Sequence, residues 1–235
     1  MVRAMRIVIP LIALLACVPA PADAATRNFG VSGFDRIRVD GPFKVRLATG
    51  VAPFAVASGS AGALDTLALE VQGRTLIVRK GRASWGGYPG EAKGPVEISI
   101  GTHELTAASL NGSGILAIDK ASGLSFDLFV QGSGVASIGS VAVDQLQVSI
   151  LGAAEVTLAG TAPRLNATIR GVSTLDASSL RVKDATITVQ GTATVKATVT
   201  GTAKVDADGV STVGFDGNPA CIVKVVGSAT VTGCR

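Results

Sequence analysis

Two stretches one period apart decide the fold: LNGSGILAI, which begins at Leu110, and VQGSGVASI, which begins at Val130. The chain then repeats variants of this motif almost to its last residue. The first glycines of the motifs are spaced by 20, 20, 19, 20, 18 and 18 residues, at Gly112, Gly132, Gly152, Gly171, Gly191, Gly209 and Gly227. A period near 20 residues indicates a solenoid, in which each repeat forms one coil.

Apolar and polar residues alternate on both sides of each glycine. The positions two, four and six residues before it are apolar or small in every repeat, from Phe126, Leu128 and Val130 to Cys221, Val223 and Val225. After the glycine, a second inward column comprises Leu116, Ala136, Val156, Leu175, Val195, Val213 and Val231, and the next one comprises Ile118, Ile138, Leu158, Ala177, Ala197 and Phe215. A period of two is typical of strands with one face in a core and the other in water.

We therefore predict an all-β fold, a single-stranded parallel β-helix whose coils hold about 20 residues and bury their inner faces on one another. Glycine is expected at each corner, because a sharp turn against the neighbouring coil requires a positive φ or a close approach. Residues 25–235 form one domain in this interpretation. Residues 25–100 are irregular opening coils that protect the first edge, and residues 101–235 are the regular coils.

The N-terminus has the order of a secretory signal peptide. Arg3 and Arg6 precede an apolar stretch, and Ala22-Asp23-Ala24 follows as a small-residue cleavage site, so residues 1–24 are predicted to be removed. A lipoprotein anchored at Cys17 is the alternative, but Leu15 fits that signal poorly. No later segment offers 18 consecutive apolar residues, which argues against a membrane span. We expect an exported protein, periplasmic or extracellular.

Cysteine usage agrees with export. Cleavage after Ala24 removes Cys17 and leaves Cys221 and Cys234, an even number that an oxidising compartment favours as a disulfide. This bond would fix the final strand as a C-terminal cap. Cleavage also lowers the formal net charge from +4 to +3, and the basic residues are scattered among acidic ones, which argues against nucleic-acid binding.

Three longer stretches suggest a family. GFDRIRVDGPFKVRLATG from Gly33, LEVQGRTLIVRKG from Leu69 and the GSG corners at Gly112 and Gly132 resemble the putative autotransporter-adhesin head domain, also called the GIN domain. The resemblance implies a secreted, right-handed β-helix of the bacterial envelope with no catalytic residues. The corners after Gly134 depart from the GSG pattern, so the resemblance assigns no role to their serines.

Few residues suggest chemistry. His103 is the only histidine, and we interpret it as a surface residue at a corner. Outward Glu155, Asp176 and Lys196 lie at related positions on successive coils and leave open a polysaccharide-processing enzyme. The threonine column of Thr174, Thr194, Thr212 and Thr230 fits the β-propensity of threonine better than an ice-binding array. No metal site and no cofactor are expected.

The most distinctive loop is KGRASWGGYPGEAKGP, from Lys80 to Pro95, which holds the only tryptophan and the only tyrosine. Trp85 and Tyr88, together with Arg82 and Lys93, are candidates for stacking on a sugar or contacting a protein. The alternative is that both aromatic rings cover the open end of the solenoid.

The sequence thus favours a non-enzymatic adhesin or ligand-binding scaffold, whose partner is a surface glycan or a protein. It leaves open a homo-oligomer, an enzyme that processes polysaccharides, and a purely structural envelope protein.

Overall fold

The computed structural model describes residues 25–81 and 96–235. Within them the chain is built from strands and one short helix. In the opening part these are β1 (Ala25–Phe29), β2 (Arg36–Asp40), β3 (Lys44–Thr49), β4 (Phe54–Gly59), α1 (Ala61–Asp65), β5 (Leu67–Gln72), β6 (Thr75–Lys80) and β7 (Glu97–Thr102). The regular part contains β8 (Ala107–Gly112), β9 (Ile115–Gly132), β10 (Val135–Gly152), β11 (Glu155–Gly209), β12 (Thr212–Asp216), β13 (Ala220–Gly227) and β14 (Thr230–Thr232).

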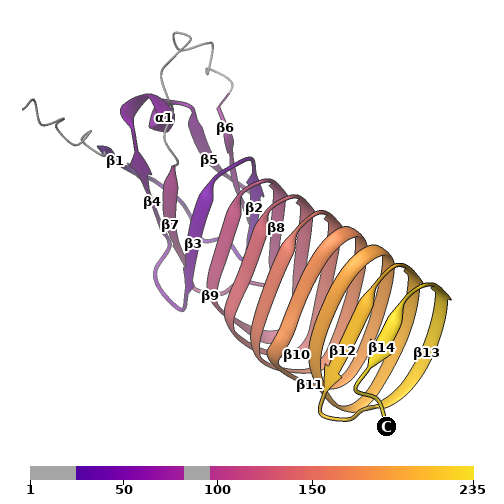
Figure 1. Ribbon diagram of the computed structural model, residues 1–235. Helices are drawn as coiled ribbons and strands as arrows, with labels where there is room; N and C mark the ends of the chain where they lie inside the picture. Colours follow the sequence, from indigo (N-terminus) through magenta and orange to yellow (C-terminus); the bar gives the residue numbers. More distant parts are fainter. Residues whose placement is uncertain (1–24, 82–95) are drawn as a thin grey trace, which may run out of the picture.

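From β8 onward the chain winds into a parallel β-helix, as predicted (Figure 1). The long strands β9, β10 and β11 run around corners without losing their pairing, so one strand label covers several sides of the solenoid. Adjacent coils pair glycine to glycine, with Gly152 opposite Gly132 on one side and Gly171 on the other. The coils are therefore about 20 residues apart, and the predicted period is confirmed.

The predicted inward columns form the core. Every predicted inward residue is buried through Ala203, Val205 and Ala207, and Phe126 is among the largest side chains that are fully buried. Each buried valine, leucine or isoleucine contributes about 1.5–3 kcal/mol to stability. A further set of buried side chains lies at the second corner of the coils. The sequence analysis did not find these residues, because the coil length varies there and their spacing is not fixed. They are Ala121, Val141, Ala162, Leu180, Val182 and Val199.

In the final coil the predicted inward orientation holds, but burial of these side chains is incomplete. Val223 and Val225 face inward, but 43% and 42% of their surfaces are exposed, and Cys221 is only partly buried. The reason is that β13 pairs with β11 alone, so within the described residues no further coil covers these side chains.

The corner glycines are required by backbone geometry. Gly132 has a φ of +110°, which side chains disfavour, and a Cβ atom added there would lie 2.6 Å from the carbonyl oxygen of Gly112. The same conflict recurs up the solenoid, because each corner glycine lies against the carbonyl group of the one before it. Gly41 begins this column one coil earlier, with a φ of +125° and its amide donating to Asn111 O.

The opening strands do not stack in chain order. β2 lies between β6 and β8, and β3 lies between β7 and β9, all of them parallel. The coil made by β6 and β7 is therefore farther from the regular coils than the coil made by β2 and β3, although it comes later in the sequence. The chain must pass the β2–β3 coil again between β7 and β8.

Antiparallel strands close this end of the solenoid. β1 pairs with β4, which pairs with β7, and β5 forms a hairpin with β6. Helix α1 begins after Ser60, whose hydroxyl group accepts the amide of Ala63, and it buries Ala63 and Leu64. Its C-terminal end is tied to β1, because Arg27 donates to Leu64 O and Asp65.

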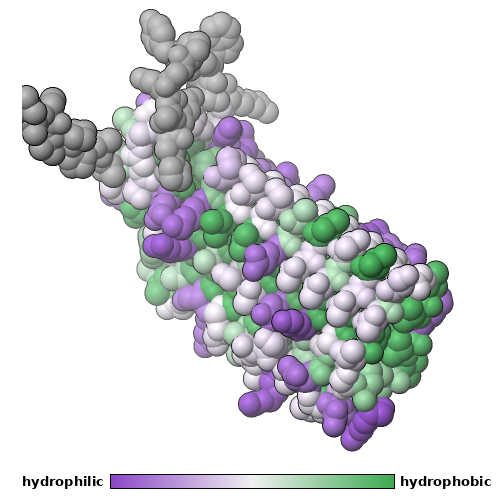
Figure 2. All heavy atoms as spheres, in the orientation of Figure 1, coloured by the Kyte–Doolittle hydropathy of each residue, from purple (hydrophilic) through white to green (hydrophobic). Residues whose placement is uncertain are grey.

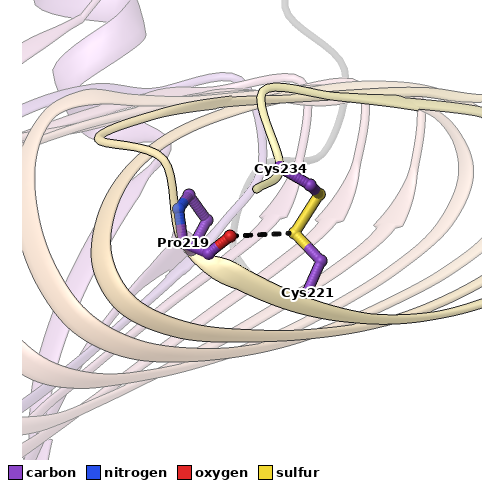
Figure 3. Close-up of a disulfide and its surroundings, with 3 residues drawn as sticks. All are labelled: Pro219, Cys221 and Cys234. Atoms are coloured by element: carbon purple, nitrogen blue, oxygen red, sulfur yellow. Dashed lines mark hydrogen bonds between the residues drawn. A yellow bond between two sulfur atoms is a disulfide. The ribbon is translucent and has the colours of Figure 1, made fainter.

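The opposite end carries the predicted disulfide. Cys221 at the start of β13 is bonded to Cys234, which follows β14, and Figure 3 shows the bond joining the two arms of the last coil. The disulfide thus closes that coil covalently, while the inward valines of β13 remain partly exposed. Within the described residues, no helix is long and apolar enough to cross a membrane.

Candidate functional site

A groove of about 440 Å³ crosses the outer face of β4, β7, β3 and β9. Its lining comprises Arg46, Leu47, Ala48, Phe54, Ser99, Ile100, Ala117, Ile118 and Asp119. Strands spaced by about 4.8 Å make it roughly 14 Å long from β4 to β9. That length suits an extended ligand better than a single small ion.

Phe54 forms one wall because of a cross-strand glycine. Phe54 pairs with Gly101 of β7, and a Cβ atom at Gly101 would lie 2.3 Å from the phenyl ring. The ring therefore lies over bare backbone, and 40% of its surface is exposed. The floor beside it is made of small outward side chains, Ala48, Ser99 and Ala117, so the groove is shallow and largely apolar.

Charged groups border the groove. Lys44 donates to Glu97 at 2.5 Å, and Arg46 Nη1 lies 4.0 Å from the same carboxylate. The hydrogen bond from Lys44, followed by the charge of its ammonium group, lowers the pKa of Glu97, and Arg46 lowers it further. Glu97 is therefore ionised at neutral pH, and the guanidinium group of Arg46 is mostly exposed with donors free for a ligand.

Asp119 stands at the other end of the groove. Its Oδ1 accepts hydrogen bonds from the amide and hydroxyl groups of Thr49 and from the amide of Lys120. The hydrogen bonds that Asp119 accepts within the described residues all go to this oxygen. The groove thus combines an aromatic wall, an apolar floor, one guanidinium group and one carboxylate.

A smaller hollow, of about 210 Å³, lies at the corner formed by Phe34, Asp35, Arg74, Thr102, His103 and Glu104. Asp35 is buried and pairs with Arg74 at 2.5 Å, and its backbone carbonyl accepts the amide and hydroxyl groups of Thr106. These bonds join β2 to the segments before β6 and β8. We interpret this cluster as structural, because its bonds hold the segments before β2, β6 and β8 together. His103 is exposed beside it.

The carboxylates considered for catalysis do not form one column. The backbone amide of Thr174 donates to Ala154 O, and this bond places Thr174 opposite Glu155 on the neighbouring coil. Asp176 and Lys196 lie two residues farther along their own coils than the position opposite Glu155. The hydroxyl and amide groups of Ser178 lower the pKa of Asp176, and Lys196 adds to this effect. A general acid of glycoside hydrolysis requires a raised pKa, so Asp176 does not suit that role.

The threonine column is real, since Thr194, Thr212 and Thr230 pair in register. The aromatic loop candidates Arg82, Trp85, Tyr88 and Lys93 lie outside the described residues.

The sequence analysis did not predict the groove. One signal was present: Ala55 and Ala57 are inward residues of a strand, and strand alternation then places the side chain of Phe54 outward. Among the described residues, no cluster of three or more histidine, cysteine or acidic side chains has the arrangement of a metal site.

A family model described as "Putative auto-transporter adhesin, head GIN domain" matches residues 33–219. The chain belongs to this family. The match spans β2 to β12, so the groove lies inside the GIN domain.

Solved structures share the fold of this GIN domain. A putative adhesin from Bacteroides fragilis NCTC 9343 aligns with a TM-score of 0.78 and 19% identity, covering 90% of this chain and 97% of the other. A putative lipid binding protein from Parabacteroides distasonis ATCC 8503 aligns with a TM-score of 0.69 and 18% identity, covering 89% and 96%. A putative adhesin from the same organism aligns with a TM-score of 0.64 and 18% identity over 89% and 96%. No curated protein matches the chain.

Proposed function

We propose that the protein is an exported, non-enzymatic adhesin that binds a surface glycan in the groove of β4, β7, β3 and β9. The observation that carries this proposal is the half-exposed ring of Phe54, which Gly101 allows to stand beside an apolar floor. A sugar ring has an apolar face that packs on an aromatic ring and hydroxyl groups at its rim. Arg46 and Asp119 supply a donor and an acceptor for those hydroxyl groups.

Two further features support the proposal. The groove lining contains a single carboxylate among the described residues, whereas hydrolysis of a glycosidic bond uses a pair. The disulfide between Cys221 and Cys234 fits a protein that folds in an oxidising compartment, periplasmic or extracellular, after removal of residues 1–24. The aromatic loop with Arg82, Trp85, Tyr88 and Lys93 is proposed as a second contact surface, for a glycan or a protein.

The test is a glycan-array screen of the exported protein, followed by calorimetric titration of the best ligand. Phe54→Ala and Ala117→Arg are expected to weaken binding at least tenfold, because one removes the stacking wall and the other fills the floor. Val172→Ala is the matched control: Val172 is 65% exposed on a coil that does not line the groove, and its variant should bind like the wild type.

Further outcomes separate the alternatives. If the double variant Trp85→Ala, Tyr88→Ala abolishes binding while Phe54→Ala retains it, the site is the aromatic loop. Binding to no glycan would contradict the proposal and favour a structural envelope role. Cleavage of a bound glycan would favour the enzyme.

A further inference from the structure

Strand β13, in the last coil of the solenoid, exposes apolar side chains on both of its faces. Ile222 and Val226 point outward and are 69% and 51% exposed, while Val223 and Val225 point inward and are 43% and 42% exposed. At the equivalent inward positions one coil earlier, Val205 and Ala207 are buried. Figure 2 shows hydrophobic residues gathered at this C-terminal end of the molecule. The core therefore ends in an uncovered apolar surface.

Within the described residues, one edge of β13 has no neighbouring strand; just before this strand, the amide of Arg235 donates to Pro219 O. The amide of Ser228 donates to Gly209 O, and Asp127, at the position equivalent to Ile222, donates to Thr106 O of the preceding coil. Successive residues of a strand point their backbone groups to opposite edges. Ile222, Lys224 and Val226 therefore bond to β11, whereas the N–H and C=O groups of Cys221, Val223 and Val225 face the open edge.

The two ends of the solenoid differ. At the N-terminal end, β1 and β5 are the outermost strands, and their outward side chains include Arg27, paired with Asp65, and Glu70, paired with Arg79. Charged side chains on an edge discourage pairing with another chain. In β13 the single charged residue is Lys224, whose Nζ lies 4.0 Å from Asp206 Oδ2, and the other outward side chains, Ile222 and Val226, are apolar and exposed.

We propose that β13 is a dimerisation strand, which pairs antiparallel with β13 of a second copy so that the two solenoids stack end to end. A two-fold axis through β13, perpendicular to the sheet, reverses the strand and the solenoid axis but keeps the inner face on the same side. The two cores then become continuous. Inward side chains of one copy meet inward side chains of the other, as side chains directly opposite in an antiparallel pair share a face.

Charge selects the register. With the axis at Val223, the edge groups of Cys221, Val223 and Val225 all find partners, Val223 meets its symmetry mate and Val225 meets Cys221. Each Lys224 then lies opposite an Ile222. With the axis at Lys224, the two ammonium groups oppose each other, which is destabilising. The self-complementary register is therefore the one centred on Val223.

One coil end offers a small contact area, so the dimer is expected to dissociate at about micromolar concentration. If the groove proposed above is the adhesive site, end-to-end pairing places two grooves at opposite ends of the dimer, which then gains from bivalent attachment.

Sedimentation velocity of the exported protein over a range of concentrations tests the assembly without any ligand. The expected result is a reversible monomer–dimer equilibrium. Val223→Lys should raise the dissociation constant at least tenfold, and the more conservative Val223→Thr severalfold. Val172→Lys, an equal change at an exposed valine away from the edge, should leave it unchanged. Hydrogen exchange should slow with concentration at the amides of Val223 and Val225, but not at those of Ile222 and Lys224.

Three results would overturn the proposal: a monomer at several hundred micromolar, open-ended oligomers that indicate head-to-tail stacking, or equal weakening by the substitutions at Val223 and Val172. Circular dichroism of each variant establishes whether it is folded. If Val223→Lys does not fold, the comparison of Val223→Thr with the wild type still tests the proposal.

Discussion

Ser173 and Ser211 occupy the same corner position in two coils, two residues after the corner glycine, but their hydroxyl groups have different surroundings. The hydroxyl of Ser173 accepts the amide of Ala154 and donates to Gly152 O at 2.9 Å. Ser211 is equally buried, and its hydroxyl has no hydrogen-bond partner within the described residues. Ala193 occupies the equivalent position in the coil between them, so alanine fits this site.

We predict that Ser173→Ala lowers the free energy of unfolding by about 1 kcal/mol, whereas Ser211→Ala leaves it unchanged or raises it by up to about 1 kcal/mol. The reason is that the first substitution removes two hydrogen bonds, while the second removes a buried polar group that has none. Urea denaturation of both variants beside the wild type measures the difference. Equal destabilisation would show that Ser211 is hydrogen-bonded in solution, for example through a buried water.

At the scale of strands, the sequence predicted what repeats and failed where repetition stops. Glycine spacing and period-two alternation placed the inward columns from Leu116 to Phe215 correctly, because every coil meets the same steric demand. The order of the opening strands was beyond prediction, since the alternation in β2 and β3 fits any parallel neighbour equally well. The groove also escaped prediction: Phe54 and Gly101 are 47 residues apart and meet only through the pairing of β4 with β7.

The last coil depends on a covalent bond as well as on packing. Cys221 and Cys234 are 13 residues apart, and closing a loop of this size stabilises a fold by about 3 kcal/mol through the entropy of the unfolded chain. Replacing both cysteines by serine is expected to lower the free energy of unfolding by about 2–3 kcal/mol, and to speed hydrogen exchange in β13 more than in β10. Denaturation and exchange mass spectrometry measure the two effects. Uniform acceleration of exchange along the solenoid would argue against a local role for the bond.

The whole molecule is a stack in which each coil contacts only its neighbours, so its length is adjustable in units of one coil. Removing residues 153–171 joins Gly152 to Val172 and excises one complete coil. The corner glycines, the inward columns and the outward faces then remain in register, with Gly152 below Gly191. We predict that this variant folds as a shorter solenoid with a cooperative transition and an intact groove, because the groove residues lie on β3, β4, β7 and β9.

Removing residues 153–162 instead provides the matched control, since it takes out about half a coil. It sets the remaining half against the wrong side of the solenoid, so apolar columns face water and corner glycines lose their positions. Circular dichroism, thermal unfolding and titration of the groove ligand distinguish the two deletions. If both unfold, stability depends on contacts beyond neighbouring coils. If both fold equally well, the register of the inward columns does not determine the fold, and the interpretation of the repeat as one coil fails.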